Sequence, residues 1–286
     1  MSRITYVNGA YVASRDAVVS VEDRGYQFGD GVYEVCEIFG GALIDEARHL
    51  DRLGRSLKEL RIEAPVNPGA LKVILREIRT RNRLSDGYLY IQVTRGVAKR
   101  DHVFPDPPVR ASLVVSAKAI APEKGEAAAR RGVNVATMPD LRWKRVDIKS
   151  IGLLANVLAR QDAKEQGAYE AWLVDSDGMI SEGAASNAWI VDRSGAIVTR
   201  QLDHSILRGV TRTTLFDIIA AEGLRLEERK FSLKEALAAQ EAFITGATTL
   251  VMPVVAIDGV KIGDGAPGPL ARKLRALFHL AAAHSN

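Results

Sequence analysis

Apolar residues along this chain recur with the periods of both strands and helices. In the first part, strands are predicted at residues 4–7, 10–12, 32–39, 88–94 and 111–117. The dipeptide Asn8-Gly9 separates the first two, which predicts a tight hairpin. Leucines at helical spacing predict a helix over residues 49–61, and a second helix is predicted over 68–83.

The pattern restarts after residues 121–126, where a proline and a glycine among charged residues favour a linker. Further strands are predicted at 133–137, 169–174, 179–181, 188–191, 196–199, 241–244 and 251–257. Further helices are predicted at 150–166, 213–222, 233–239 and 270–284. The chain is therefore predicted to be a two-domain α/β (α+β) protein, with a small N-terminal α/β domain (1–120), the linker, and a larger C-terminal domain (127–286).

Composition narrows the class of protein. Of 286 residues, 47% are apolar and 26% charged, which is ordinary for a globular protein. The net charge is only +4 and the basic residues are scattered among 35 acidic ones, which argues against a nucleic-acid partner. No apolar run approaches the ~20 residues of a membrane helix, and the polar, mixed residues 3–8 lead us to expect no signal peptide. With Cys36 as the single cysteine, we expect a cytoplasmic protein without disulfides.

Two segments combine small and hydroxyl residues in a way that suits an anion. Residues 208–214, which include Val210 and Thr211, directly precede a helical pattern, and free N–H groups at a helix start attract phosphate. Residues 245–249, which include Ala247 and Thr248, follow a strand. No nucleotide-binding glycine motif is present. Either segment alone is better explained as an ordinary capped turn.

Three further groups are candidates for chemistry. Glu182 stands at a strand end before four small residues, so a flat ligand could approach closely and meet a carboxylate. Lys149 lies between a short apolar alternation and a predicted helix, but the residues alone do not favour it over Lys144 or over a surface lysine. Arg100 and His102, two apart on an extended loop, could together bind a carboxylate. The histidines have no zinc-ligand spacing.

The order of these groups carries more information than any one of them. Six spaced blocks resemble, in sequence order, those of the class IV (fold type IV) pyridoxal-phosphate-dependent aminotransferases. They are Phe28-Gly-Asp-Gly-Val-Tyr-Glu34, His49-Leu-Asp-Arg-Leu53, Asp147-Ile-Lys-Ser150, Ser181-Glu-Gly-Ala-Ala-Ser-Asn187, Leu207-Arg-Gly-Val-Thr-Arg212 and Thr245-Gly-Ala-Thr-Thr249. The resemblance extends over essentially the whole chain.

The resemblance implies a role for each candidate. Lys149 would carry the pyridoxal 5′-phosphate as a Schiff base, and Glu182 would face the pyridine nitrogen. Arg52 would bind the phosphate through its side chain. Val210, Thr211, Ala247 and Thr248 would bind it through backbone and hydroxyl groups. The family also implies a two-domain fold with the cofactor between the domains, and a homodimer.

Within the class, the chain most resembles D-amino-acid aminotransferases. The resemblance rests on Arg100-Asp-His-Val-Phe-Pro105, because in that family an Arg-x-His pair reaches the neighbouring active site and binds the substrate α-carboxylate, with Tyr33 matching the partner tyrosine. Residues 167–171 agree with it. Gly246-Ala247 departs from it and is closer to the branched-chain pattern. The implied reaction transfers the amino group of D-alanine or D-glutamate to a 2-oxo acid.

Other functions stay open on the sequence alone. Branched-chain L-amino-acid aminotransferases and (R)-selective amine transaminases share the cofactor blocks. So do lyases of the aminodeoxychorismate type, which release pyruvate without an amino acceptor. A non-catalytic protein that binds the cofactor, or a scaffold, is the remaining alternative.

Overall fold

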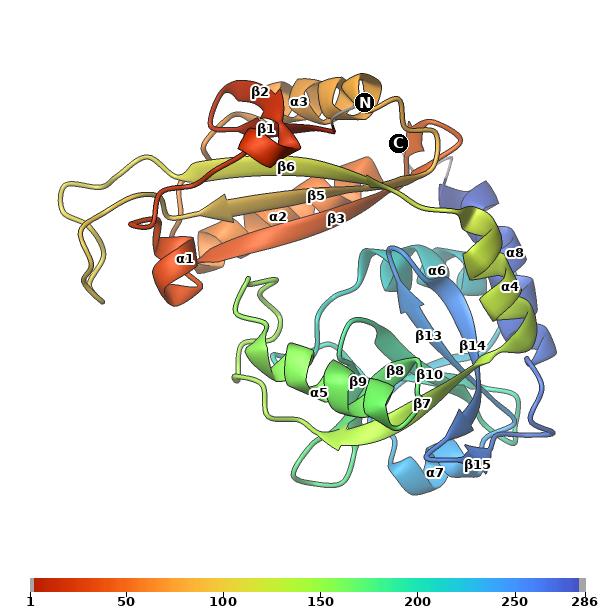
Figure 1. Ribbon diagram of the computed structural model, residues 1–286. Helices are drawn as coiled ribbons and strands as arrows, with labels where there is room; N and C mark the ends of the chain where they lie inside the picture. Colours follow the sequence, from red (N-terminus) through yellow and green to blue (C-terminus); the bar gives the residue numbers. More distant parts are fainter. Residues whose placement is uncertain (1–2, 283–286) are drawn as a thin grey trace. The chain divides into compact units, whose positions relative to one another are not determined.

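The computed structural model describes residues 3–282, and the chain folds into two compact units. Of the described residues, the first unit contains 3–121 together with Ile148–Gly152, and the second contains Pro122–Asp147 and 153–282. Each unit has its own sheet (Figure 1). Each also has its own apolar core.

The first unit is built on an antiparallel six-stranded sheet in the order β2-β1-β6-β5-β3-β4. Its strands are β1 (Ile4–Val7), β2 (Ala10–Ala13), β3 (Gly31–Phe39), β4 (Ala42–Leu43), β5 (Gly87–Thr94) and β6 (Ser112–Ala119). The predicted hairpin is confirmed: Val7 pairs with Ala10, and Asn8 and Gly9 both have positive φ, as a two-residue turn of this kind requires.

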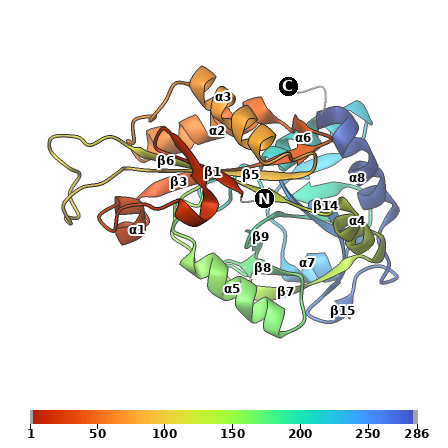
Figure 2. The same ribbon diagram turned by 45° about the horizontal axis from the view of Figure 1, so that its top comes forward.

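Two helices cover one face of this sheet, α2 (Glu46–Glu59) and α3 (Pro68–Arg81), which lie side by side (Figure 2). Helix α3 begins where Asn67 accepts a hydrogen bond from the Ala70 N–H, with Pro68 at the first helical position. Alternate residues of β3, namely Val32, Cys36 and Ile38, share one core with both helices. The intervening residues, among them Tyr33, therefore lie on the opposite face.

The second unit has a mixed nine-stranded sheet, with β12-β11-β10-β13-β14-β7-β8-β9 as its main path and β15 paired to β14. Its strands are β7 (Val133–Pro139), β8 (Glu170–Val174), β9 (Ile180–Gly183), β10 (Asn187–Val191), β11 (Ile197–Thr199), β12 (Leu226–Glu228), β13 (Glu241–Gly246), β14 (Leu250–Ile257) and β15 (Val260–Lys261). Its helices are α4 (Pro122–Arg131), α5 (Leu154–Glu165), α6 (Val210–Ala221), α7 (Leu233–Leu237) and α8 (Pro269–Ala282). The last two residues of the predicted helix 270–284 lie outside the described residues.

The predicted linker was wrong. Most of residues 121–126 belong to helix α4, and the second unit begins at Pro122 rather than at residue 127. The proline read as a linker signal stands at the start of the helix, where it is well tolerated. Glu123 in the first turn and Arg130 and Arg131 in the last also suit the helix dipole.

The segment around Lys149 also differs from its prediction. A helix was predicted from residue 150, but α5 begins at Leu154, and Ile148–Gly152 group with the first unit rather than the C-terminal one. The reason is a backbone pairing: Val32 of β3 forms an antiparallel bridge with Ser150. A peptide group that bonds to a strand in this way is not available for a helix.

Leu75→Ala should lower the free energy of unfolding by about 2–5 kcal/mol, because Leu75 is fully buried between α3 and the sheet. Val73→Ala is the matched control on the same helix, since Val73 is 59% exposed. Denaturant unfolding followed by circular dichroism measures both. An equal loss in the two variants would contradict the assignment of the buried face.

Candidate active site

Lys149 is held by backbone hydrogen bonds to the first residues of β3. The Tyr33 N–H donates to the Lys149 carbonyl at 3.0 Å, and the Ile151 N–H donates to the Gly31 carbonyl at 3.1 Å. A Cβ on Gly31 would stand 2.6 Å from the Val93 carbonyl oxygen and 3.0 Å from Ile151 Cδ1. A larger residue at 31 would therefore push the segment away from the strand.

The side chain of Lys149 lies against Tyr33. Its Nζ is 4.2 Å from the centroid of the Tyr33 ring, which in turn stacks on Tyr90 at 5.5 Å. Burial, with a smaller contribution from Tyr33, raises the pKa of Tyr90 to about 12, so this hydroxyl stays protonated and donates to Gln92 Oε1. The predicted cofactor lysine and the predicted substrate tyrosine are thus neighbours on the sheet face that α2 and α3 leave uncovered.

Arg52 is fixed by a buried carboxylate. Glu34, which is fully buried, accepts from Arg52 Nε at 2.7 Å and from Nη2 at 2.8 Å, and lies 2.8 Å from His49 Nδ1. Burial alone would raise the pKa of Glu34, but Arg52 and then His49 outweigh it and hold the pKa at about 2. The guanidinium therefore has one orientation in the fold.

Arg52 and Lys149 belong to the same neighbourhood. Ser56, one helical turn after Arg52 on α2, has its Oγ 3.4 Å from the Lys149 backbone nitrogen. Glu34, which holds Arg52, is next to Tyr33 in β3. The first unit therefore brings together three of the predicted site residues, Tyr33, Arg52 and Lys149.

Arg100 and His102 meet at a different place in the first unit. Both lie on an exposed loop between β5 and β6. The Arg100 guanidinium is 4.6 Å from the centroid of the Phe28 ring, and the His102 ring centroid is 5.4 Å from it. Phe28 thus groups the two predicted carboxylate-binding side chains, and no contact in the described chain joins them to Tyr33 or Lys149.

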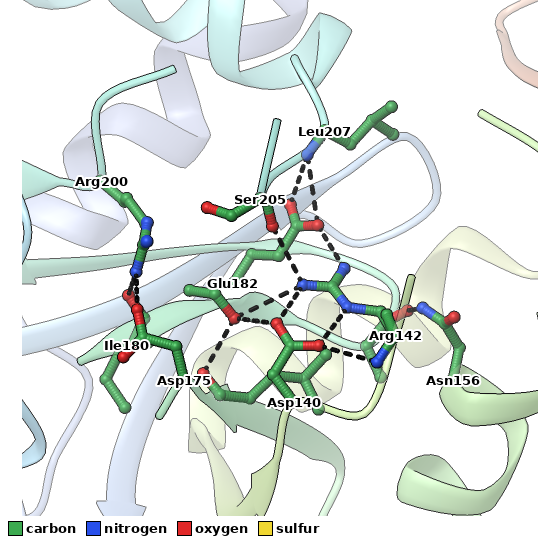
Figure 3. A network of polar contacts seen from close by, with 12 residues as sticks. Asp140, Arg142, Asn156, Asp175, Ile180, Glu182, Arg200, Ser205 and Leu207 are labelled. Atoms are coloured by element: carbon green, nitrogen blue, oxygen red, sulfur yellow. Dashed lines mark hydrogen bonds and ion pairs between the residues drawn. The ribbon is translucent and has the colours of Figure 1, made fainter. Parts of the chain in front are cut away.

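Glu182, on β9 of the second unit, is buried among hydrogen-bond donors (Figure 3). Its Oε1 is 2.6 Å from Arg142 Nη1, the Leu207 N–H donates to both oxygens at 3.1–3.2 Å, and Asn187 Nδ2 donates to Oε2 at 2.9 Å. Burial raises the pKa of Glu182, and Arg142 and the Leu207 N–H oppose the rise.

Arg142 bridges two carboxylates. Besides Glu182, it donates from Nε and Nη2 to Asp140 at 2.9 and 2.7 Å (Figure 3). Asp140 also accepts from the Ser181 hydroxyl. The sequence prediction gave no role to Arg142, Asp140 or Asn187. Only the Asp-x-Arg spacing directly after strand β7 could have indicated the first two, and that spacing is common on surfaces.

The two predicted anion segments converge on Asn187. Its Nδ2 donates to the Leu207 carbonyl at 3.0 Å as well as to Glu182, and its Oδ1 lies 2.1 Å from where a Cβ on Gly209 would stand. In the sheet, Asn187 of β10 pairs with Thr245 of β13. In the same segment as Thr245, a Cβ on Gly246 would stand 3.3 Å from the Ala185 carbonyl oxygen. Glu182 and the first segment therefore meet at the Asn187 side chain, and the second segment is the strand neighbour of Asn187. The absence of a Cβ at residues 209 and 246 permits these close approaches.

The N–H groups at the start of α6 point to an acceptor outside the helix. The helix begins at Val210, three residues before the predicted start, which makes Val210 and Thr211 its first two positions. Such N–H groups have no carbonyl one turn back within the helix, and Gly209 at the N-cap has no side chain to accept from them. Ala247 and Thr248 lie in the turn between β13 and β14, with Thr248 exposed.

The described part of the chain holds neither a cluster of metal-ligating side chains nor a helix that could span a membrane. No three His, Cys, Asp or Glu side chains there are grouped as a metal ion would require. None of its helices combines the length and the apolar character that crossing a membrane demands.

Comparison with known proteins gives one family. The profile of the amino-transferase class IV family matches residues 31–257. The D-alanine aminotransferase of Bacillus licheniformis is 41% identical, over 94% of this chain and 93% of its own, and that of Staphylococcus haemolyticus is 37% identical, over 96% of both. The crystal structure of a T.th. branched-chain amino acid aminotransferase with pyridoxamine 5′-phosphate has a TM-score of 0.90 at 28% identity, covering 100% of this chain and 96% of its own.

Arg142→Met should lower the free energy of unfolding by about 3–5 kcal/mol, because it leaves Glu182 buried without its cation. Adding Glu182→Gln should recover part of the loss, since the remaining side chain is neutral. Denaturant unfolding at neutral pH measures the series. Arg145→Met is the matched control: this arginine pairs with Asp147 but is 37% exposed, so it should cost less than about 1 kcal/mol. Equal costs for the two arginines would refute the argument.

Proposed function

The chain belongs to the class IV aminotransferases, a pyridoxal-phosphate-dependent family, and from this premise we propose that it transfers the amino group of a D-amino acid to a 2-oxo acid. The observation that supports the substrate class is the full-length similarity to relatives named D-alanine aminotransferases, together with an Arg-x-His pair grouped on one aromatic ring. D-Alanine and D-glutamate are the expected amino donors.

The donor groups of the chain fit pyridoxal phosphate. The Lys149 amine, which forms no ion pair in the described chain, would attach covalently to the aldehyde carbon. Glu182, already supplied with three fixed donors, would accept from the pyridine N–H. Arg52, the N–H groups of Val210 and Thr211, and the Ala247-Thr248 turn would bind the phosphate. A Cβ at residue 183, 209 or 246 would meet the side chain of Ser186, Asn187 or Thr249, so glycine at these positions leaves room for the close packing around these groups.

Each residue then has a defined task. When bound, the cofactor supplies an electron-accepting ring that stabilises the negative charge left at the substrate Cα. Lys149 Nζ removes the Cα proton as a general base and can return it as a general acid. Glu182 keeps a proton on the ring nitrogen, and Arg142 holds the Glu182 carboxylate in position for this.

Substrate binding requires a second copy of the chain. In the proposed homodimer, Arg100 and His102 of one copy bind the α-carboxylate of the amino acid at the neighbouring site, and Tyr33 of that site completes the contact. A guanidinium suits this role because it binds a carboxylate through two parallel hydrogen bonds. We place the dimer in the cytoplasm, because the single cysteine is buried and unpaired, so no disulfide stabilises the fold.

A branched-chain L-amino-acid aminotransferase is the second candidate. One observation favours it: the Gly246-Ala247 turn resembles the branched-chain pattern, and the T.th. enzyme of that name has nearly the same fold. Fold similarity alone does not decide the substrate, because class IV chains with different substrates share it. The two candidates differ in the hand and the side chain of the preferred amino donor.

Lys149→Ala should abolish covalent attachment of the cofactor. The purified variant should lack the visible absorption band of bound cofactor, and borohydride should fix no cofactor to the chain, as read by intact-protein mass. Lys144→Ala, five residues earlier, is the control and should retain both signals. Borohydride fixation in Lys149→Ala would place the attachment at another lysine.

The substrate proposal predicts that D-alanine outperforms L-leucine with 2-oxoglutarate as acceptor in a coupled assay. Arg100→Ala should raise KM for D-alanine roughly a hundredfold, the order expected when one partner of a desolvated charge pair is removed. The KM for an amine without a carboxylate should change little, and Lys99→Ala should change neither. Faster turnover of L-leucine would reject the D-amino-acid assignment, and equal effects of Arg100→Ala on both donors would reject the carboxylate contact.

A further inference from the structure

Arg24 is a buried arginine whose guanidinium is bonded to the backbone of a distant loop. It begins the short helix α1 (Arg24–Phe28) and is only 3% exposed. Nη1 donates to the carbonyls of Asp101 at 2.6 Å and Val103 at 3.3 Å, and Nη2 reaches that of His102 at 3.5 Å. Three successive carbonyls of the loop that carries Arg100 and His102 are therefore bound by one side chain.

The other edge of the Arg24 guanidinium is anchored as well. Its Nε donates at 2.8 Å to Asp30, which also accepts from Arg95 Nε at 2.7 Å and Nη2 at 3.0 Å. Burial alone would raise the pKa of Asp30, but the hydrogen bonds from Arg95 and Arg24 lower it, so the carboxylate is charged. Arg95 in turn donates to the carbonyls of Leu60 and Arg61 at the end of α2. The loop is thereby tied to a helix of the first unit.

Arg24 also acts on the side chains of the loop through Phe28. The Phe28 ring has Arg24 4.9 Å from its centroid and Arg100 4.6 Å from it, and the His102 ring lies 5.4 Å away. Phe28 and Arg24 belong to the same short helix, which Asp23 caps by accepting from the Gly25 N–H. One element thus fixes both the backbone of residues 101–103 and the surface on which Arg100 and His102 rest.

An unanchored loop of this kind would bind a carboxylate weakly. Residues 98–111 contain no regular helix or strand, and most are exposed. Ordering such a loop at the moment of binding costs conformational entropy, which lowers affinity. A loop held in advance does not incur that cost. The buried anchor is therefore suited to increase affinity for substrate without contacting it.

We propose that Arg24 is a positioning residue that presets Arg100 and His102, so that it controls binding of the α-carboxylate at the neighbouring copy's site. This inference rests on the proposed function, in which that pair binds the substrate carboxylate across a homodimer. Arg24 itself touches neither substrate nor cofactor. Its effect is on KM for carboxylate substrates, and it is exerted in trans.

The first test compares kinetic constants of the complete enzyme with cofactor bound. Arg24→Met should raise KM for D-alanine by about tenfold or more, the order expected for loss of preorganisation. Its kcat should change little, as should its KM for an amine without a carboxylate. Arg79→Met is the matched control, because Arg79 also donates to a backbone carbonyl in the first unit, that of Gly41. If Arg24→Met does not fold, Arg24→Lys keeps a cation beside Asp30 and should show the same split between KM and kcat.

An unchanged KM for D-alanine in a folded Arg24 variant overturns the proposal, as does an equal rise for both donors. The outcome for Arg100→Ala separates this failure from that of the proposed function. If Arg100→Ala leaves KM unchanged, the carboxylate contact itself is wrong. If Arg100→Ala raises KM and the Arg24 variants do not, only the positioning role fails.

The second test uses mixed dimers. Co-expression with two affinity tags yields dimers of one Lys149→Ala copy and one copy with the Arg24 substitution. The only competent lysine then faces the intact loop of the Lys149→Ala copy, so KM for D-alanine should return to the wild-type value. A KM that stays raised shows that Arg24 acts on the site of its own copy, which overturns the proposal that it acts on the site of the neighbouring copy. A Lys149→Ala and Arg100→Ala dimer is the reference, and a raised KM there would instead refute the placement of the loop across the dimer.

Discussion

The site depends first on one short backbone pairing. For five residues, Ile148–Gly152, the chain leaves the second unit and lies along the start of β3, bridged at Val32 and Ser150. The Tyr33 N–H donates to the Lys149 carbonyl, and the Ile151 N–H donates to the Gly31 carbonyl. These two hydrogen bonds, on either side of the bridge, hold the backbone of Lys149 in the geometry of an antiparallel strand pair. Without them the same residues have the sequence pattern of a helix start, and Lys149 would be one surface lysine among several.

Two polar groups of the site share a second feature, a buried partner of opposite charge: Arg52 is held by Glu34, and Glu182 by Arg142. The loop of Arg100 is bound through its carbonyls by Arg24, which itself pairs with Asp30. Burying such pairs costs desolvation free energy that their attraction barely offsets, so they are poor sources of stability. They do restrict orientation. Charged groups that cannot reorient bind an ionic ligand without reorganisation, which is the usual origin of strong electrostatic effects in active sites.

Substrate preference is carried by parts that the common fold leaves variable. The chain has almost the same fold as a branched-chain enzyme at 28% identity, yet D-alanine aminotransferases are among its sequence relatives at 37–41% identity over nearly the full length. Three features suit any member of the family that holds the same cofactor: the strands, the bridge at Ser150 and the small residues around Asn187. The loop between β5 and β6, with its anchor at Arg24, carries Arg100 and His102, to which we assign the substrate carboxylate.

By itself the sequence determined what depends on neighbours a few positions away. The Asn8-Gly9 hairpin, the helices over Leu50–Leu60 and after Pro68, and the buried alternation of β3 all follow from local turn chemistry and periodicity. Its ordered blocks also determined the family. Only the tertiary structure decided that 150 begins no helix, that 122–126 is helical, and which partners hold the site. Arg24 lies 77 positions from Asp101, and Arg142 lies 40 from Glu182. No local pattern encodes such pairs, because long-range packing alone brings them within hydrogen-bond distance.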